Sequence, residues 1–108
     1  MDNEGAECAA FIDSLDEVEY WVRNLDREDY SFWLPTSTDR FYPDFVVQLR
    51  DGRILVVEYK GGYLADTPDT KEKDIIGQIW ASKSKGRCLF RIVGKTDYRV
   101  EIQTMIKR

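Results

Sequence analysis

Three charged residues, Asp44, Glu58 and Lys60, each lie beside a stretch of apolar residues. Asp44 precedes the run 45–49, and the other two end the run that starts at Ile54. A charged group that folding buries is costly unless it is paired or bound to a metal. Two carboxylates and an ammonium gathered at one end of two strands are typical of a site for a divalent cation with a phosphate group.

The spacing of these residues predicts their chemistry. Magnesium usually takes one or two protein carboxylates, while water and a substrate phosphate complete its shell. Glu58 and Lys60 are two apart on one strand, so they share a face and the ammonium lies beside the carboxylate. There it can orient or deprotonate a water molecule and offset charge in the transition state. The backbone carbonyl of Tyr59 is a further candidate ligand. A salt-bridge cluster at a sheet edge fits the spacing equally well, so both alternatives stay open here.

The turn between the two apolar strands decides whether the carboxylates meet. A two-residue loop would place Asp44 opposite Tyr59, on the other face of the sheet from Glu58. A three-residue loop over residues 50–52, with Gly52 in the left-handed region, places Asp44 opposite Glu58. We predict the three-residue loop, because only this register brings both carboxylates to one face.

Composition narrows the classes of function. The 108 residues suffice for one domain, and they include no histidine, which excludes Ser-His-Asp triads and histidine-based zinc sites. Cys8 and Cys88 lie far apart and are expected to be reduced core thiols of a cytoplasmic protein. No apolar run is long enough to span a membrane. The net charge of −4 disfavours autonomous nucleic-acid binding, an objection that is eased if neighbouring domains hold the DNA.

Hydrophobic periodicity and turn residues predict the other elements. Before the central hairpin they predict an amphipathic helix from Glu7 to about Leu25 and a first strand over 30–34. After the hairpin they predict a second helix, which is capped by Asp69 or Thr70, runs to about Ser84 and is closed by Gly86. A strand over 88–93 follows, and the tail over 100–105 favours helix over strand. Three meandering strands and a helical crossover predict an α/β (α+β) class, a mixed sheet flanked by helices. On the second helix we expect Ile75, Ile76, Ile79 and Trp80 to supply the apolar surface.

The run FYPDFVVQLRDGRILVVEYKG places Pro43-Asp44 before a hairpin and Glu58-Tyr59-Lys60 after it, which resembles the PD-(D/E)XK signature of a nuclease superfamily. With YWVRNL before it and DT, EK, IG and WA after it, residues 7–94 resemble the endonuclease domain at the C-terminus of type III restriction enzyme (Res) subunits and helicase-fused relatives. The resemblance implies a restriction-endonuclease-like core in the order helix-strand-strand-strand-helix-strand. It also implies Mg²⁺-dependent hydrolysis of double-stranded DNA, with Mn²⁺ as a substitute.

The resemblance implies further site residues. In that superfamily an acidic residue on the first helix often completes the metal site, and Glu7 is the first choice by position, with Glu17 and Glu19 behind it. A glutamine on the second helix, here Gln78, contacts the water or the substrate in some branches. An ordinary helix-terminal acid and a solvated helix glutamine are the alternatives for Glu7 and Gln78.

Basic residues gather around the second helix, and they are Lys71, Lys73, Lys83, Lys85 and Arg87. They are candidates for contact with a phosphate backbone, Lys73 first and Lys71 next, although a solvated helix face is the alternative.

The resemblance also implies that residues 1–108 are a fragment of a larger restriction or helicase protein. Its partners would be double-stranded DNA and a neighbouring helicase/ATPase domain or DNA-modification subunit, and a homodimer would supply the two sites that cutting both strands needs. A catalytically inactive interaction module that keeps the nuclease fold is the alternative function.

Overall fold

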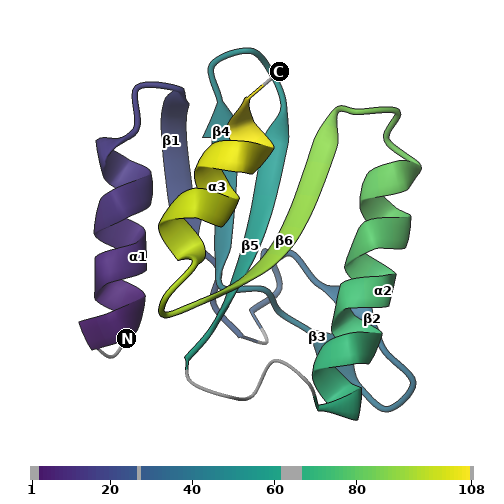
Figure 1. Ribbon diagram of the computed structural model, residues 1–108. Helices are drawn as coiled ribbons and strands as arrows, with labels where there is room; N and C mark the ends of the chain where they lie inside the picture. The colour runs from purple at the N-terminus through teal and green to yellow at the C-terminus, as the bar shows by residue number, and fades with distance from the viewer. Residues whose placement is uncertain (1–2, 27, 62–66, 108) are drawn as a thin grey trace.

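The computed structural model describes residues 3–26, 28–61 and 67–107 and has an α+β architecture, a mixed sheet flanked by helices (Figure 1). The elements in chain order are α1 (Asn3–Ser14), β1 (Val18–Arg23), β2 (Leu34–Pro35), β3 (Arg40–Phe41), β4 (Phe45–Leu49), β5 (Ile54–Lys60), α2 (Pro68–Ser82), β6 (Cys88–Gly94) and α3 (Tyr98–Ile106).

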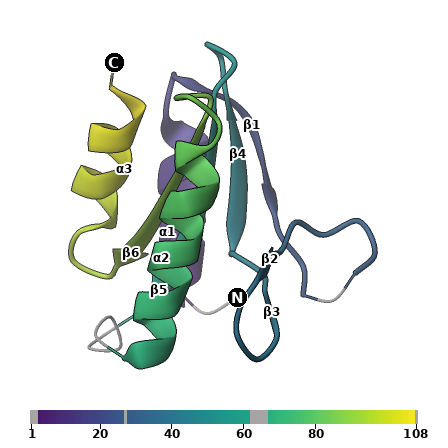
Figure 2. The ribbon, with the colours of Figure 1, turned by 90° about the vertical axis from the view of Figure 1, so that its right-hand side faces the viewer.

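The main sheet has four strands in the order β1-β4-β5-β6. Strands β1, β4 and β5 are antiparallel neighbours, and β6 returns through α2 to lie parallel to β5. Strands β2 and β3 form a separate two-stranded sheet. Figure 2 shows three features at the same end of the molecule: the end of β5, the start of α2 and the β2–β3 sheet. That end holds the candidate site.

The sheet separates two hydrophobic cores. Helices α1 and α3 cover one face, where Ile12, Leu55 and Ile102 are fully buried. Helix α2 and the β2–β3 sheet cover the other face, where Phe90 and Val56 are fully buried. Because neighbouring β5 residues point to opposite faces, the sequence Ile-Leu-Val-Val supplies both cores at once.

The predicted three-residue turn of the central hairpin is confirmed. Phe45 pairs with Val57, and the Leu49 N–H donates to the Arg53 carbonyl at 2.9 Å. Gly52 has a φ of 97°, in the left-handed region that favours glycine. This register brings the residue before β4 opposite the end of β5.

The predicted helix from Glu7 to Leu25 is wrong beyond Ser14, because Val18–Arg23 is strand β1. The segment VEYWVR is β-branched and aromatic, and pairing with β4 satisfies its backbone, which outweighs a coincidental helical spacing. The predicted strand over 30–34 is also wrong except at Leu34, which pairs with Phe41 outside the main sheet. The main sheet and its helices therefore follow the chain order α1, β1, β4, β5, α2, β6, with β1 in place of the strand predicted over 30–34.

Helix α2 differs from its prediction at both ends. Thr67, rather than Asp69 or Thr70, is the N-cap, since its hydroxyl accepts the Thr70 N–H at 3.1 Å. The helix ends at Ser82, so Gly86, with a φ of 88°, lies in the following turn and does not close the helix.

Only part of the expected apolar face of α2 is buried. Ile76 and Trp80 pack against the Phe90 core, whereas Ile75 and Ile79 are 60% and 50% exposed. Ile75 and Ile79 are four residues apart and so lie on one outward face of the helix.

Strand β6 and helix α3 agree with the predicted strand over 88–93 and the favoured helical tail. Cys8 and Cys88 are both free thiols, the first buried and the second half-buried. Among the described residues, no helix has the length and apolar character needed to cross a membrane. Residues 62–66, between β5 and α2, lie outside the described residues.

We expect Gly77→Ala to destabilise the fold, because the added Cβ would overlap the buried ring of Phe90. Overpacking of this kind costs about 1–3 kcal/mol, against a gain in helix propensity of about 1 kcal/mol. Chemical denaturation measures the net change. Gly94→Ala is the matched control, since its added Cβ would lie at ordinary contact distance from the Lys60 carbonyl (3.4 Å) and Asp97 Oδ1 (3.5 Å). A Gly77→Ala protein as stable as the Gly94→Ala protein would contradict this packing.

Candidate active site

A pocket of about 240 Å³ lies where β5 ends. Side chains from the β1–β2 loop, the β3–β4 segment, β5 and α2 line it, and they are Asp26, Arg40, Phe41, Tyr42, Asp44, Glu58 and Lys73. The structure thus brings three predicted site residues, Asp44, Glu58 and Lys73, into one pocket. Lys60 contacts Glu58 at its edge.

Backbone contacts fix Asp44 in place. Its Oδ2 accepts the Tyr59 N–H at 2.8 Å, so the amide of Tyr59 orients the carboxylate. The Asn24 N–H donates to the Asp44 carbonyl at 2.8 Å, and the Asn24 side chain donates to the carbonyls of Pro43 and Phe32. Asn24 therefore ties the β1–β2 loop to the residue that precedes β4. The proposed role of the Tyr59 carbonyl stays a prediction.

Glu58 is the most buried charged group of the pocket, with 6% of its surface exposed. Burial and the neighbouring Asp44 carboxylate raise the pKa of Glu58 to about 8, although Lys60 and Lys73 act in the opposite direction. Glu58 Oε2 lies 3.3 Å from Lys60 Nζ. Glu58 Oε1 is buried and finds no hydrogen-bond donor among the described residues. A proton shared with Asp44 or a bound cation would satisfy this oxygen.

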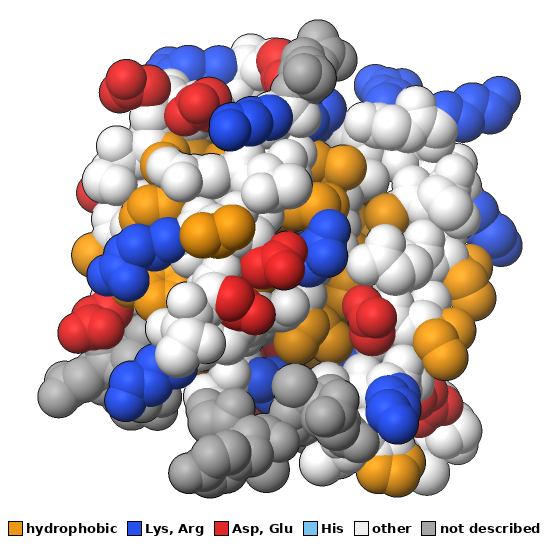
Figure 3. Space-filling view, in the orientation of Figure 1, with side chains coloured by type: hydrophobic (Ala, Val, Ile, Leu, Met, Phe, Trp, Pro, Cys, Tyr) orange, Lys and Arg blue, Asp and Glu red, His pale blue; other side chains and the backbone are white. Residues whose placement is uncertain are grey.

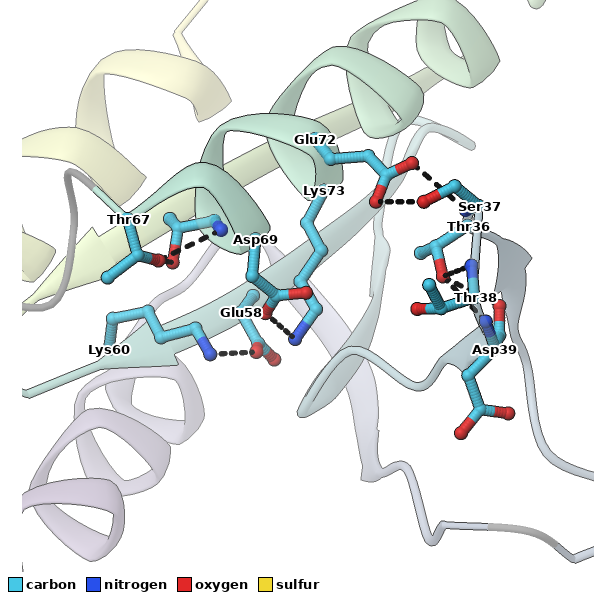
Figure 4. Close-up of polar contacts among 11 residues, drawn as sticks. Thr36, Ser37, Thr38, Asp39, Glu58, Lys60, Thr67, Asp69, Glu72 and Lys73 are labelled. Atoms are coloured by element: carbon cyan, nitrogen blue, oxygen red, sulfur yellow. Dashed lines mark hydrogen bonds and ion pairs between the residues drawn. The ribbon is translucent and has the colours of Figure 1, made fainter.

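Lysines reach toward Glu58 from two elements (Figure 4). Lys60 extends along β5, and Lys73 descends from the first turns of α2. Lys73 Nζ lies 3.0 Å from Asp69 Oδ2 and 5.0 Å from the centre of the Phe41 ring. Lys71 is exposed and is not among the residues that line the pocket.

Two residues that the resemblance implied lie away from the pocket lining. Glu7 is exposed on α1, and the next residue, Cys8, is buried in the core that α1 and α3 cover. Burial and the charge of Asp44 raise the pKa of the Cys8 thiol to about 12, so this thiol stays protonated. Gln78 Nε2 donates to the Phe90 carbonyl at 3.0 Å and so holds α2 against β6.

The other two acids considered on the first helix lie elsewhere. Glu17 is exposed between α1 and β1, and Glu19 is exposed on β1. Neither residue lines the pocket.

Sequence reasoning missed Asp26, Arg40 and Tyr42 as pocket residues. Tyr42 was visible only as part of the motif, and Arg40 stands four residues before Asp44. The guanidinium of Arg40 stacks over the Trp33 ring at 4.3 Å. No periodic signal marks these positions, because the loops and the two-residue strand that carry them are placed by tertiary contacts.

The turn between β2 and β3 is fastened to α2 (Figure 4). The Ser37 N–H and hydroxyl donate to the two oxygens of Glu72 at 2.9 and 3.2 Å. Within the turn, Thr36 Oγ1 accepts the Asp39 N–H at 3.0 Å. The wall of the pocket that carries Arg40 is therefore held in a fixed position relative to Lys73.

Comparison with protein-family models, with curated proteins and with solved structures gives no match. The function must therefore be argued from the site itself. Among the described residues no group of three or more Cys, Asp or Glu side chains is arranged to hold a metal ion. Asp44 and Glu58 form a two-carboxylate set, which matches what magnesium usually takes from a protein.

In a chelating buffer we expect the stability of the protein to fall as the pH rises from about 4.5 to about 8. In this range the unfolded chain ionises Glu58 while the folded protein keeps its proton, so the folded state binds more protons and loses stability with rising pH. The contribution is on the order of a few kcal/mol.

The measurement is denaturation across this pH range with Glu58→Gln, which should lack the fall. Glu28→Gln, at an exposed loop position, is the matched control and should keep it. If stability depends on pH in the same way in the wild type and in Glu58→Gln, the conclusion that the buried Glu58 carboxyl is protonated is wrong.

Proposed function

We propose that this chain is a metal-dependent endonuclease domain that hydrolyses phosphodiester bonds in DNA, of the PD-(D/E)XK type. The observation that carries the proposal is the buried Glu58 carboxyl beside Asp44, with one oxygen that finds no donor among the described residues. A fold gains nothing in stability from such an arrangement, because buried like charges are costly. Binding of a ligand by the two carboxylates would explain why the protein has this arrangement.

The donor set fits a hard divalent cation. Asp44 and Glu58 would hold Mg²⁺ or Mn²⁺ through oxygen, and the pocket leaves room for water and a phosphate group. When bound, the cation would supply Lewis-acid chemistry, which makes water more acidic and neutralises charge on the phosphate. The Tyr59 amide, which donates to Asp44 Oδ2, would keep the other oxygen of this carboxylate directed at the ligand.

Lys60 would act on the reacting groups. Its Nζ lies 3.3 Å from Glu58 Oε2, and 23% of the side chain is exposed, so it can reach a substrate without leaving its carboxylate. From that position it would orient the attacking water, help to remove its proton and offset the negative charge that grows on the phosphate. Lys73 would contribute positive charge from the opposite wall.

The resemblance further supports a type III restriction-like setting in the cytoplasm. In that setting a helicase/ATPase domain or a DNA-modification subunit would supply most of the grip on double-stranded DNA. The net charge of −4 agrees with such help. Figure 3 shows acidic and basic side chains interspersed over the face that carries α3 and α2, and DNA binding needs a basic surface. A homodimer would place two such sites on opposite strands.

The alternative function is a catalytically inactive interaction module with the same fold. One observation favours it: both lysines of the site already have carboxylate partners, Lys60 with Glu58 and Lys73 with Asp69. Their charges are therefore partly balanced without a cation. The two functions differ in whether a cation binds and whether DNA is cut.

We expect the protein to nick plasmid DNA in magnesium or manganese, and Lys60→Ala to lower the rate about 100-fold or more, as loss of a general acid–base group does. Asp44→Asn should abolish both nicking and the rise in melting temperature that manganese gives the wild type, since the rise reports binding to the native state. Lys60→Ala should keep that rise.

Lys107→Ala, an exposed lysine beyond α3, is the matched control and should nick like the wild type. If neither cation changes the melting temperature of the wild type and the wild type leaves DNA intact, the nuclease proposal is contradicted and the interaction module is favoured.

A further inference from the structure

Arg40 differs from the other cations around the site. Lys60 and Lys73 each lie within 4 Å of a carboxylate oxygen. The Arg40 guanidinium has no carboxylate partner among the described residues, and it stacks on the Trp33 ring at 4.3 Å. The charge is therefore held in position by an aromatic face rather than neutralised by an acid.

A guanidinium that stacks on an aromatic ring keeps its N–H groups at the edge, in the plane of the fork. That fork matches two oxygens of a phosphate group. Trp33 is 41% exposed and Arg40 is exposed, so a ligand can reach the N–H edge of the guanidinium from solvent. The arrangement suits an anion that arrives from outside the protein.

The backbone around Arg40 is fixed. Its N–H donates to Asp39 Oδ1 at 2.7 Å, and Pro35 pairs with Arg40 across the β2–β3 sheet. The turn that precedes it is fastened to α2 through Ser37 and Glu72. Arg40 therefore enters the pocket from a wall that is held on two sides.

The charges of the pocket favour one kind of ligand. The carboxylates Asp44 and Glu58 lie at the end of β5, whereas Arg40 approaches from β3. Without a bound metal ion, the carboxylates would repel an anion. With a metal ion between Asp44 and Glu58, a ligand that carries two or more phosphate groups could contact the metal ion with one group and Arg40 with another. A nucleic-acid backbone has phosphates at regular spacing, and half or more of protein–DNA hydrogen bonds go to phosphate and sugar.

We infer that Arg40, positioned by Trp33, binds a phosphodiester group of a nucleic-acid strand next to the one that is cut. The inference rests on the proposed function and adds to it the residue that places the strand. Arg40 contacts substrate in this account, and Trp33 is a positioning residue. Arg40 fixes where the strand lies and takes no part in the proton transfers.

The test is binding of a fluorescein-labelled DNA oligonucleotide, measured by anisotropy in calcium, which occupies oxygen sites. We expect Arg40→Ala to weaken binding roughly tenfold, as loss of a charged hydrogen bond does. It should also lower the slope of log affinity against log salt by about 1. Arg40→Lys should recover only part of the affinity, because the ammonium lacks the fork.

Three further variants separate a contact from a structural effect. Trp33→Leu should weaken binding as Arg40→Ala does, since it removes the support of the guanidinium. Arg99→Ala removes an exposed arginine of α3 that stacks on the Tyr98 ring at 4.5 Å, and as the matched control it should bind like the wild type. In magnesium, Arg40→Ala should raise the KM for cleavage with little change in kcat, whereas Lys60→Ala should lower kcat. Melting temperatures establish that each variant is folded.

The outcomes distinguish this inference from the proposed function. Cleavage by a folded Arg40→Ala protein with unchanged KM and unchanged binding overturns the inference and leaves the nuclease standing. Arg40-dependent binding without any cleavage supports the phosphate site and overturns the nuclease. Inorganic phosphate that competes as well as a DNA strand would show a site for free phosphate, and it would overturn the assignment to nucleic acid.

Discussion

The proximity of the carboxyl groups of Asp44 and Glu58, in one pocket, is the constraint on which the site depends. The left-handed Gly52 sets the hairpin register that places these two residues opposite each other. Val56 and Val57 before Glu58 are fully buried, so the strand cannot slip without exposing both cores. Burying two acids together costs free energy because the ionised form of Glu58 is disfavoured, and this raises the pKa of Glu58. The two apolar cores on either side of β5 offset it.

The remaining parts of the pocket place positive charge around these two carboxyl groups. Lys60 comes from the same strand, Lys73 from the helix that follows, and Arg40 from the small sheet that α2 holds through Glu72. Acids therefore lie at the end of β5 and cations lie along the surrounding walls. Such an arrangement suits the phosphodiester hydrolysis that we propose, with a divalent cation bound first and an extended polyanion bound across it.

The sequence predicts the hairpin and the convergence of Asp44, Glu58 and Lys60, because strand alternation and turn chemistry are local rules. It does not predict where α1 ends, since pairing with β4 decides that Val18–Arg23 is a strand. Arg40 and Asp26 could not be assigned to the site either. Their positions depend on tertiary contacts, such as the bonds from the Asn24 side chain to the carbonyls of Pro43 and Phe32.

The most direct measurement of the central claim is the anomalous scattering of crystals soaked in manganese at a pH above the pKa of Glu58. The account predicts a peak between the carboxylates of Asp44 and Glu58, at coordination distance from both, with Glu58 Oε1 turned toward it. Asp44→Asn crystals soaked in the same way should lack the peak. Wild-type crystals with no peak between these two groups would show that the ionised carboxylates bind no cation, and the hydrolytic account would be wrong.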